Sequence, residues 1–195
     1  GQTEEKEKRS KKKVKEKQDS PQLKIHYKDT DQTHLLLGVR SANMFSPDRH
    51  AAVLLGTVLG GGMSSRMFSE IREKRGLTYY ISCAADQATD AGYLFTGAGV
   101  EHQNLTKALR LILEELKKTA RGKISEKELA KAKEYIKGKT LMSLESSSAV
   151  ANFFGDQELF KKKPEKPAEL FKKIDAVTAE DIKKTAQDNV QNEKL

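Results

Sequence analysis

The sequence predicts an α+β domain in which a mostly antiparallel sheet carries helices packed on one face. Strand-like segments lie mainly in the first half of the chain, and a run of helical segments fills the second half. Two strand-like segments are separated by a turn of only four residues, 88–91. Strands and helices in separate runs are typical of α+β folds. The 195 residues suffice for one domain with a tail.

Four segments are predicted to be strands. Residues 23–28 alternate apolar and polar side chains, and residues 33–41 form a more continuous apolar run. Residues 79–87 and 92–100 predict an antiparallel hairpin, because only a short turn lies between them.

The helices follow from apolar periodicity and capping signals. Ser46-Pro47 predicts the start of a helix that is apolar nearly all round and therefore buried. Ser125 with Glu128 predicts a capping box at the start of another helix. Pro164 and Pro167 are expected to break the helical run. The predicted helices cover about 48–59, 101–119, 126–146, 147–161 and a last segment that begins near Ala179.

Residues 60–80, GGGMSSRMFSEIREKRGLTYY, predict a glycine turn, a short helix and the start of a strand. Ser64 or Ser65 is expected to cap the helix, and Gly76 to end it. Met67, Phe68 and Ile71 are expected to form an apolar stripe along one side of this helix. On the polar side, ion pairs are expected between Arg66 and Glu70 and between Glu70 and Lys74.

Arg72 and Tyr79 each leave two interpretations open. No acidic residue lies three or four positions from Arg72, so it either covers the edge of the core or reaches a partner outside its helix. Strand alternation would place Tyr79 on one face with Ile81 and Cys83, where it would pack in the core with a solvated hydroxyl. The residues alone do not choose between these roles.

The 60–80 stretch resembles the signature segment in the C-terminal half of M16 zinc peptidases, a family that includes insulin-degrading enzyme, pitrilysin and the mitochondrial processing peptidase. In that family an Arg and a Tyr seven residues apart follow a glycine-rich turn, and Arg72 and Tyr79 match this spacing. The resemblance extends from about Leu23 to the end of the chain. It implies the family's half-domain fold, which ends in one more strand than this sequence supplies.

The resemblance also implies a division of labour. The family's zinc motif, HxxEH, is absent here, because no two of the four histidines (His26, His34, His50 and His102) lie four residues apart. His26 and His34 lie on neighbouring predicted strands, but no carboxylate or Cys cluster accompanies them. We therefore expect no metal in this chain and zinc in an N-terminal half or a partner subunit. Arg72 and Tyr79 would contact the substrate carbonyl.

The charge distribution indicates a tail and a domain. Residues 1–17 carry eight Lys or Arg against four Glu, about half of the net charge of +8. Residues 1–19 hold one large apolar residue, Val14, and are expected to form an interdomain linker or solvated tail before a domain at 20–195. Residues 191–195 resemble the lead-in to the missing strand. No aromatic residues accompany the basic run, so nucleic acid is not the expected partner.

The function that the sequence predicts is the substrate-binding, chamber-forming half of a zinc endopeptidase, inactive alone. Its expected partners are an N-terminal zinc domain, a peptide substrate and a second subunit in a homo- or heterodimer. The alternative is a non-catalytic M16-like subunit that acts as a scaffold or activator; a basic nucleic-acid-binding module ranks third. The single cysteine, Cys83, fits a reducing compartment such as the cytoplasm, and no apolar run is long enough for a membrane span.

Overall fold

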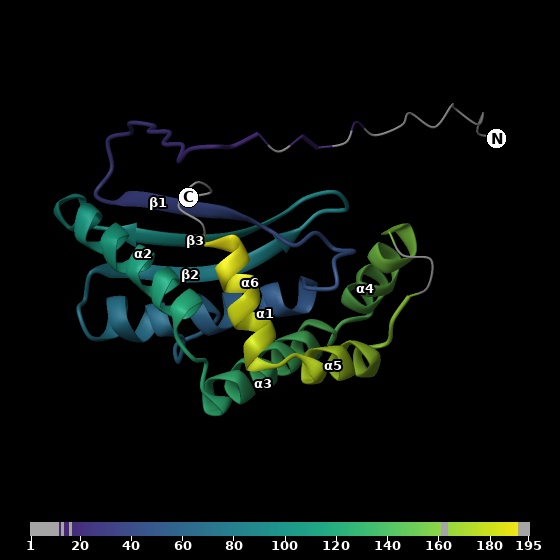
Figure 1. Ribbon diagram of the computed structural model, residues 1–195. Coiled ribbons are helices and arrows are strands. Elements are labelled where there is room, and N and C mark those ends of the chain that lie inside the picture. Colours follow the sequence, from purple (N-terminus) through teal and green to yellow (C-terminus); the bar gives the residue numbers. More distant parts are fainter. Residues whose placement is uncertain (1–11, 13, 16, 161–163, 191–195) are drawn as a thin grey trace.

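The computed structural model describes residues 12, 14–15, 17–160 and 164–190, and it confirms the α+β fold. A three-stranded antiparallel sheet has helices packed against one face (Figure 1). The hairpin predicted from the sequence forms the second and third strands. The strands, in the spatial order β1-β3-β2, are β1 (Thr33–Ser41), β2 (Thr78–Gln87) and β3 (Gly92–Val100).

The helical segments largely match the prediction. One helix was not expected, because Pro167 was interpreted as a helix breaker. Pro167 instead occupies the first turn of α5, where its missing N–H costs no hydrogen bond. The helices are α1 (Arg49–Gly60), η1 (Phe68–Glu73, a π-helix), η2 (His102–Asn104, a 3₁₀-helix), α2 (Leu105–Arg121), α3 (Glu126–Ser143), α4 (Ser147–Phe160), α5 (Pro167–Ala176) and α6 (Ala179–Asn189).

The strand predicted at residues 23–28 does not form. This segment has no ladder partner, and the apolar side chains Leu23, Ile25 and Tyr27 are 80–86% exposed. Alternation alone does not make a strand, because isolated extended backbone has no partner for its N–H and C=O groups. Residues 12, 14–15 and 17–19 of the expected tail are exposed and form no helix or strand, while the rest of the tail and the expected lead-in at 191–195 lie outside the described residues.

Helix α1 forms the centre of the core. Its residues Leu54, Leu55 and Leu59 are fully buried, as the apolar sequence predicts, and they pack with side chains of the sheet and the other helices. At its last turn α1 comes very close to β2. A Cβ atom added to Gly60 would lie 2.7 Å from Cβ of Cys83, so only glycine fits there. The helix can therefore end directly against the strand before the chain turns.

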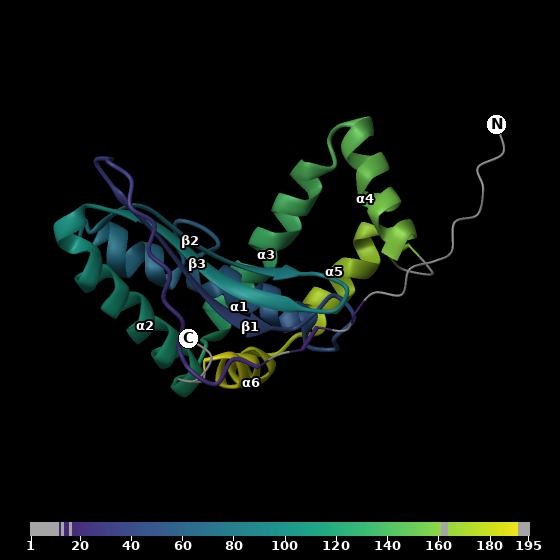
Figure 2. The same cartoon turned by 90° about the horizontal axis from the view of Figure 1, so that it is seen from above.

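The helical layer is uneven in how closely it covers the sheet. Helices α1, α2 and α6 pack together beneath it, and α5 packs against α3 and α1. Helix α4 and the end of α3 extend away from the sheet (Figure 2). Their exposed apolar side chains include Leu141, Met142 and Leu159.

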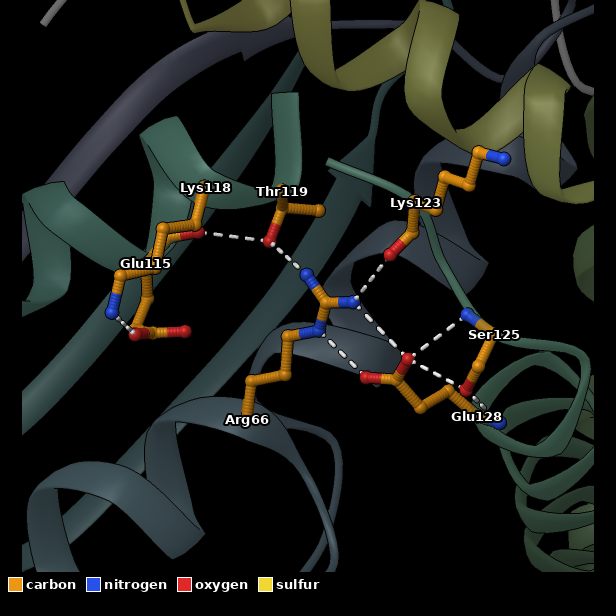
Figure 3. A network of polar contacts seen from close by, with 7 residues as sticks. All are labelled: Arg66, Glu115, Lys118, Thr119, Lys123, Ser125 and Glu128. Atoms are coloured by element: carbon orange, nitrogen blue, oxygen red, sulfur yellow. Dashed lines mark hydrogen bonds and ion pairs between the residues drawn. The ribbon is translucent and has the colours of Figure 1, made fainter. Parts of the chain in front are cut away.

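Arg66 ties the short helix after the glycine turn to two other helices (Figure 3). Its Nε donates to Oε1 of Glu128 at 2.7 Å, and its Nη1 donates to Oγ1 of Thr119 at 3.0 Å. Its Nη2 donates to Oε2 of Glu128 and to the carbonyl of Lys123, each at 3.1 Å. Glu128 also completes the predicted capping box with Ser125. One guanidinium thus joins this segment to the end of α2 and the start of α3.

The prediction of an ion pair between Arg66 and Glu70 is therefore wrong. The carboxylate of Glu70 instead accepts from Lys74, at 2.9 Å, and from Arg75, so the second pair expected on this helix does form. The predicted Ser64 or Ser65 cap is not found either. The Ser65 hydroxyl instead donates to the carbonyl of Gly62, in the glycine turn, at 2.6 Å, and the start of η1 has no side-chain cap.

The close approach of α1 to β2 predicts opposite effects for two glycine substitutions. Gly60→Ala should lower the free energy of unfolding by about 1–3 kcal/mol, since the added methyl group meets backbone atoms that cannot rotate away. Gly138→Ala, inside α3 and with open space around it, should raise it by about 0.5–1 kcal/mol. Urea denaturation of both variants measures these changes. Equal stability of the two variants would contradict the packing described here.

The Arg66–Glu128 pair predicts a pH-dependent contribution to stability. The hydrogen bond from Arg66, opposed by partial burial and assisted by Ser125, lowers the pKa of Glu128 from 4.5 to about 2. Because the folded-state pKa lies below the unfolded value, the stabilisation is complete above pH 4.5 and is lost as the pH falls toward 2. Glu128→Gln should cost about 1–2 kcal/mol at pH 7, allowing for solvent screening, and much less near pH 2.5. If the difference in unfolding free energy between the wild type and Glu128→Gln stays constant over this pH range, the contribution assigned to the Arg66–Glu128 pair is refuted.

Candidate functional site

The candidate residues lie where η1 ends and β2 begins. Gly76 adopts a left-handed conformation with φ of 62°, as its predicted role as a helix stop requires. The reversal lets the amides of Gly76 and Leu77 donate to the carbonyls of Arg72 and Ile71, at 3.0 and 3.1 Å. Buried Ile71 and Leu77 fix the inner side of this turn. Arg72 and Tyr79 therefore belong to two elements joined by one short, well-held connection.

Arg72 is exposed, and its guanidinium lies over the ring of Phe68, 5.0 Å from the centroid. Within the described part of the chain, no hydrogen bond or ion pair is made by this guanidinium. The side chain therefore covers the edge of the apolar stripe, which was one of its two predicted roles. All five N–H donors nonetheless remain available to a group outside the chain.

No ion pair neutralises Arg72 among the residues that the structure describes. Glu70, the acidic residue two positions earlier, is occupied by Lys74 and Arg75. Hydrogen bonds from Lys74 and then Arg75 lower the pKa of Glu70 to about 2, so it stays ionised and paired. The helix thus pairs two of its three nearby cations and leaves the third facing solvent.

Tyr79 sits in an irregularity of the strand. Thr78 pairs with Val100 and Tyr80 pairs with Gly99, so Tyr79 is an extra residue in β2 that has no partner in the register with β3. Such a bulge turns a side chain away from the ordinary alternation. Tyr79 is 50% exposed, and its hydroxyl lies 3.5 Å from Oε1 of Glu101. The expectation that Tyr79 shares the buried face of Ile81 and Cys83 is wrong for this reason.

The structure does not join Arg72 and Tyr79 directly. The guanidinium rests on Phe68 and the phenol points to Glu101. What they share is exposure at the same junction of helix and strand. In the structure the two side chains are two separate donors, each held by a weak contact.

A second aromatic residue next to Tyr79 was not singled out by the sequence analysis. Tyr80 lies on the open face of the sheet, and its hydroxyl is 3.0 Å from Nδ1 of His34 across the strand between them. Both residues pair with Gly99, and a Cβ atom there would come within 2.5 Å of the Tyr80 ring. The signal available in the sequence was the glycine opposite both residues, but it could be used only once the register was known.

The open face of the sheet is poor in charge close to this junction. His34 and Leu36 on β1 and Tyr80 and Ser82 on β2 are exposed, and Gly97 and Gly99 of β3 lie between them. Leu36 is 72% exposed. In a chain with 33% charged residues, this is a flat, mostly uncharged surface that begins beside Tyr79.

The remaining reactive residues are accounted for by local contacts. Within the described residues there is no cluster of three or more His, Cys, Asp or Glu side chains suited to a metal. His102 bridges Thr33 and the carbonyl of Thr30, and His26 lies on the segment that forms no strand, so it does not adjoin His34 across a ladder as expected. Cys83 is buried, which raises the pKa of its thiol to about 11 and keeps it protonated.

No helix in the described part of the chain combines the length and the apolar content that a membrane crossing requires.

Comparison with known protein families and sequences gives a consistent result. The model of the "Peptidase M16 inactive domain" matches residues 2–136. An uncharacterized zinc protease of Mycobacterium tuberculosis is 34% identical over 168 residues, which cover 86% of this chain and 38% of the relative. The uncharacterized zinc protease YmxG of Bacillus subtilis is 33% identical over 155 residues, covering 80% of this chain and 38% of the relative. The chain thus spans about two fifths of the length of these relatives.

Solved structures share the fold. A protease from Helicobacter pylori superposes with a TM-score of 0.78 at 25% identity, covering 91% of this chain and 43% of the other. The peptidase M16 inactive domain from Pseudomonas fluorescens superposes with a TM-score of 0.74 at 23% identity, covering 85% and 40% of the two chains. The sequence resemblance, the family match and the observed fold agree: this chain belongs to the M16 peptidase family and represents its inactive, C-terminal domain.

Proposed function

We propose that this chain is the substrate-binding, chamber-forming half of a zinc-dependent M16 endopeptidase. The zinc ion and the general base come from an N-terminal half, in the same polypeptide or in a partner subunit. The observation that carries the proposal is the pair of exposed donors at one junction: Arg72, which has no ion-pair partner among the described residues, and Tyr79, which a bulge turns outward. They stand at the spacing that the family's signature segment requires.

The chemistry of peptide hydrolysis explains why these two side chains suit the role. When water attacks a peptide carbonyl, negative charge develops on its oxygen, and donors placed near that oxygen lower the barrier. A tyrosine hydroxyl offers one directional hydrogen bond, and a guanidinium adds a full positive charge. Weak contacts with Glu101 and Phe68 can be exchanged for a substrate at little cost.

The open sheet face supports the chamber-forming part of the proposal. The helices cover the opposite face, so the exposed face of β1, β3 and β2 carries no helix and could line a space enclosed with the other half. His34, Leu36 and Tyr80 give it aromatic and apolar contacts close to Tyr79. Such a surface accommodates varied peptide side chains better than a charged one does, because fewer polar groups must be desolvated.

The second candidate function is that of a non-catalytic subunit, which serves as a scaffold or activator. One chain of complex III₂ from Candida albicans has the same fold, with a TM-score of 0.75 at 20% identity, covering 83% of this chain and 40% of that one. The zinc motif in the sequence of the N-terminal half distinguishes the two functions. An intact HxxEH motif there supports the peptidase, whereas a degenerate motif supports the scaffold.

Substitutions at the two donors test the peptidase proposal in the complete enzyme. Tyr79→Phe removes one donor with little change in volume and should lower kcat by about 10²–10³-fold. Arg72→Ala should lower turnover to a similar extent and also weaken substrate binding. Zinc content and melting temperature should hardly change, because both side chains are exposed.

Two variants on the helical side of the molecule are matched controls. Tyr135→Phe on α3 and Arg110→Ala on α2 remove the same groups from exposed side chains outside the candidate site, and turnover should stay at the wild-type level. Wild-type turnover in both Tyr79→Phe and Arg72→Ala would end the catalytic interpretation of this segment.

The division of labour predicts the behaviour of the isolated chain. Purified alone, it should hold no stoichiometric zinc and should cleave no peptide, because the ligands and the base lie in the other half. Elemental analysis after dialysis against a weak chelator, together with a peptide-cleavage assay, checks this. About one zinc ion per chain, or zinc-dependent cleavage, would contradict the proposal.

A further inference from the structure

We propose that Arg66 is a positioning residue that orients the Arg72–Tyr79 segment, with Glu128 as its main partner. This inference rests on the function proposed above. The segment from Arg66 to Tyr79 is continuous: a helical turn, η1, the Gly76 reversal and the start of β2. Any rotation of η1 about its axis would move the guanidinium of Arg72. A group that fixes this rotation therefore controls where the donor points.

Apolar contacts alone do not fix the rotation. Met67 and Ile71 are fully buried and hold η1 against the core, yet hydrophobic contacts have no strong directional preference. The outward side of η1 bears Arg72, whose guanidinium lies over the ring of Phe68 in the same helical segment and makes no hydrogen bond or ion pair among the described residues. The Thr96 hydroxyl donates only to the sulfur of Met67, at 3.8 Å, whereas Arg66 supplies strong directional contacts with another part of the molecule.

The bonds of Arg66 are directional and their acceptors are rigid. Two parallel bonds connect the guanidinium to both carboxylate oxygens of Glu128, a geometry that fixes orientation as well as distance (Figure 3). Thr119, which accepts a hydrogen bond from Nη1 of Arg66, is buried at the end of α2, and its own hydroxyl donates to the carbonyl of Glu115 at 2.8 Å. Glu128 is held in turn by the Ser125 amide and hydroxyl, at 3.0 and 2.8 Å.

The placement of this network also suits a positioning role. The side chains of Arg66 and Glu128 are 18% and 35% exposed, so water competes with the pair less than it does on an open surface. Arg66 makes no hydrogen bond with Arg72 or Tyr79 in the structure. We therefore do not assign Arg66 a direct electrostatic role in the reaction. Its effect on the reaction passes through the backbone of η1.

Arg66→Lys in the complete zinc peptidase tests the proposal. Lysine keeps the charge but lacks the planar fork that reaches Glu128, Thr119 and the Lys123 carbonyl together. We expect kcat per folded, zinc-loaded molecule to fall by about 10–100-fold, as for a misplaced catalytic group, with little change in KM. Glu128→Gln, which is nearly isosteric, should have a smaller effect in the same direction and guards against misfolding of the first variant.

A double-mutant cycle with Tyr79→Phe separates positioning from simple stabilisation. If Arg66 acts through the segment, Arg66→Lys should cost clearly less in the Tyr79→Phe background than in the wild type, because part of its target is already gone. As a control, Lys137→Gln breaks a comparable pair between α3 and α5, where Lys137 lies 2.7 Å from Asp175. It should lower the melting temperature without lowering turnover.

The outcomes are distinguishable. Wild-type turnover in Arg66→Lys, with a large loss in Tyr79→Phe, would overturn the positioning role and leave the proposed function intact. Independent, multiplicative losses in the double variant would also overturn it. Wild-type turnover in both Tyr79→Phe and Arg72→Ala would remove the site itself, and the positioning role with it.

Discussion

The packing of α1 against β2 is the constraint on which the rest of this domain depends. Gly60 lets the end of the helix touch the strand at Cys83, and the chain must then turn away at once. The turn leads into η1, and two buried side chains, Met67 just before η1 and Ile71 within it, enter the same core. Because the helix end and the strand are in contact, the path left for η1 is short, and Gly76 returns the chain to the strand that α1 already touches. The location of Arg72 and Tyr79 follows from this closed path.

The site combines a rigid frame with loosely held donors. Hydrogen bonds with several elements fix Arg66, whereas Arg72 and Tyr79 have only a ring contact and a long hydrogen bond. This contrast suits a surface that must present donors to an incoming carbonyl without first breaking strong bonds. The neighbouring charges keep Arg72 available as a donor, because Glu70 is paired with Lys74 and Arg75 and does not neutralise Arg72.

Much of the fold could be predicted from the sequence, because local signals and tertiary packing agree. The capping box of Ser125 and Glu128, the hairpin at 79–100 and the Gly76 stop were all visible in the residues. Prediction failed where the outcome depends on a distant partner. Residues 23–28 alternate like a strand but find no neighbour, and Arg66 prefers Glu128, far along the chain, to Glu70 one turn away. The bulge at Tyr79 was equally inaccessible, since it appears only when the register with β3 is known.

The central claim is that Arg72 and Tyr79 face the scissile carbonyl in the assembled enzyme. A crystal structure of the complete peptidase with a bound peptide, its catalytic base substituted to prevent cleavage, measures this most directly. We expect the Tyr79 hydroxyl and the Arg72 guanidinium to leave Glu101 and Phe68 and to lie about 2.7–3.2 Å from carbonyl oxygens of the peptide near the zinc ion. A complex in which both side chains keep their present contacts, with the peptide held elsewhere, would contradict it.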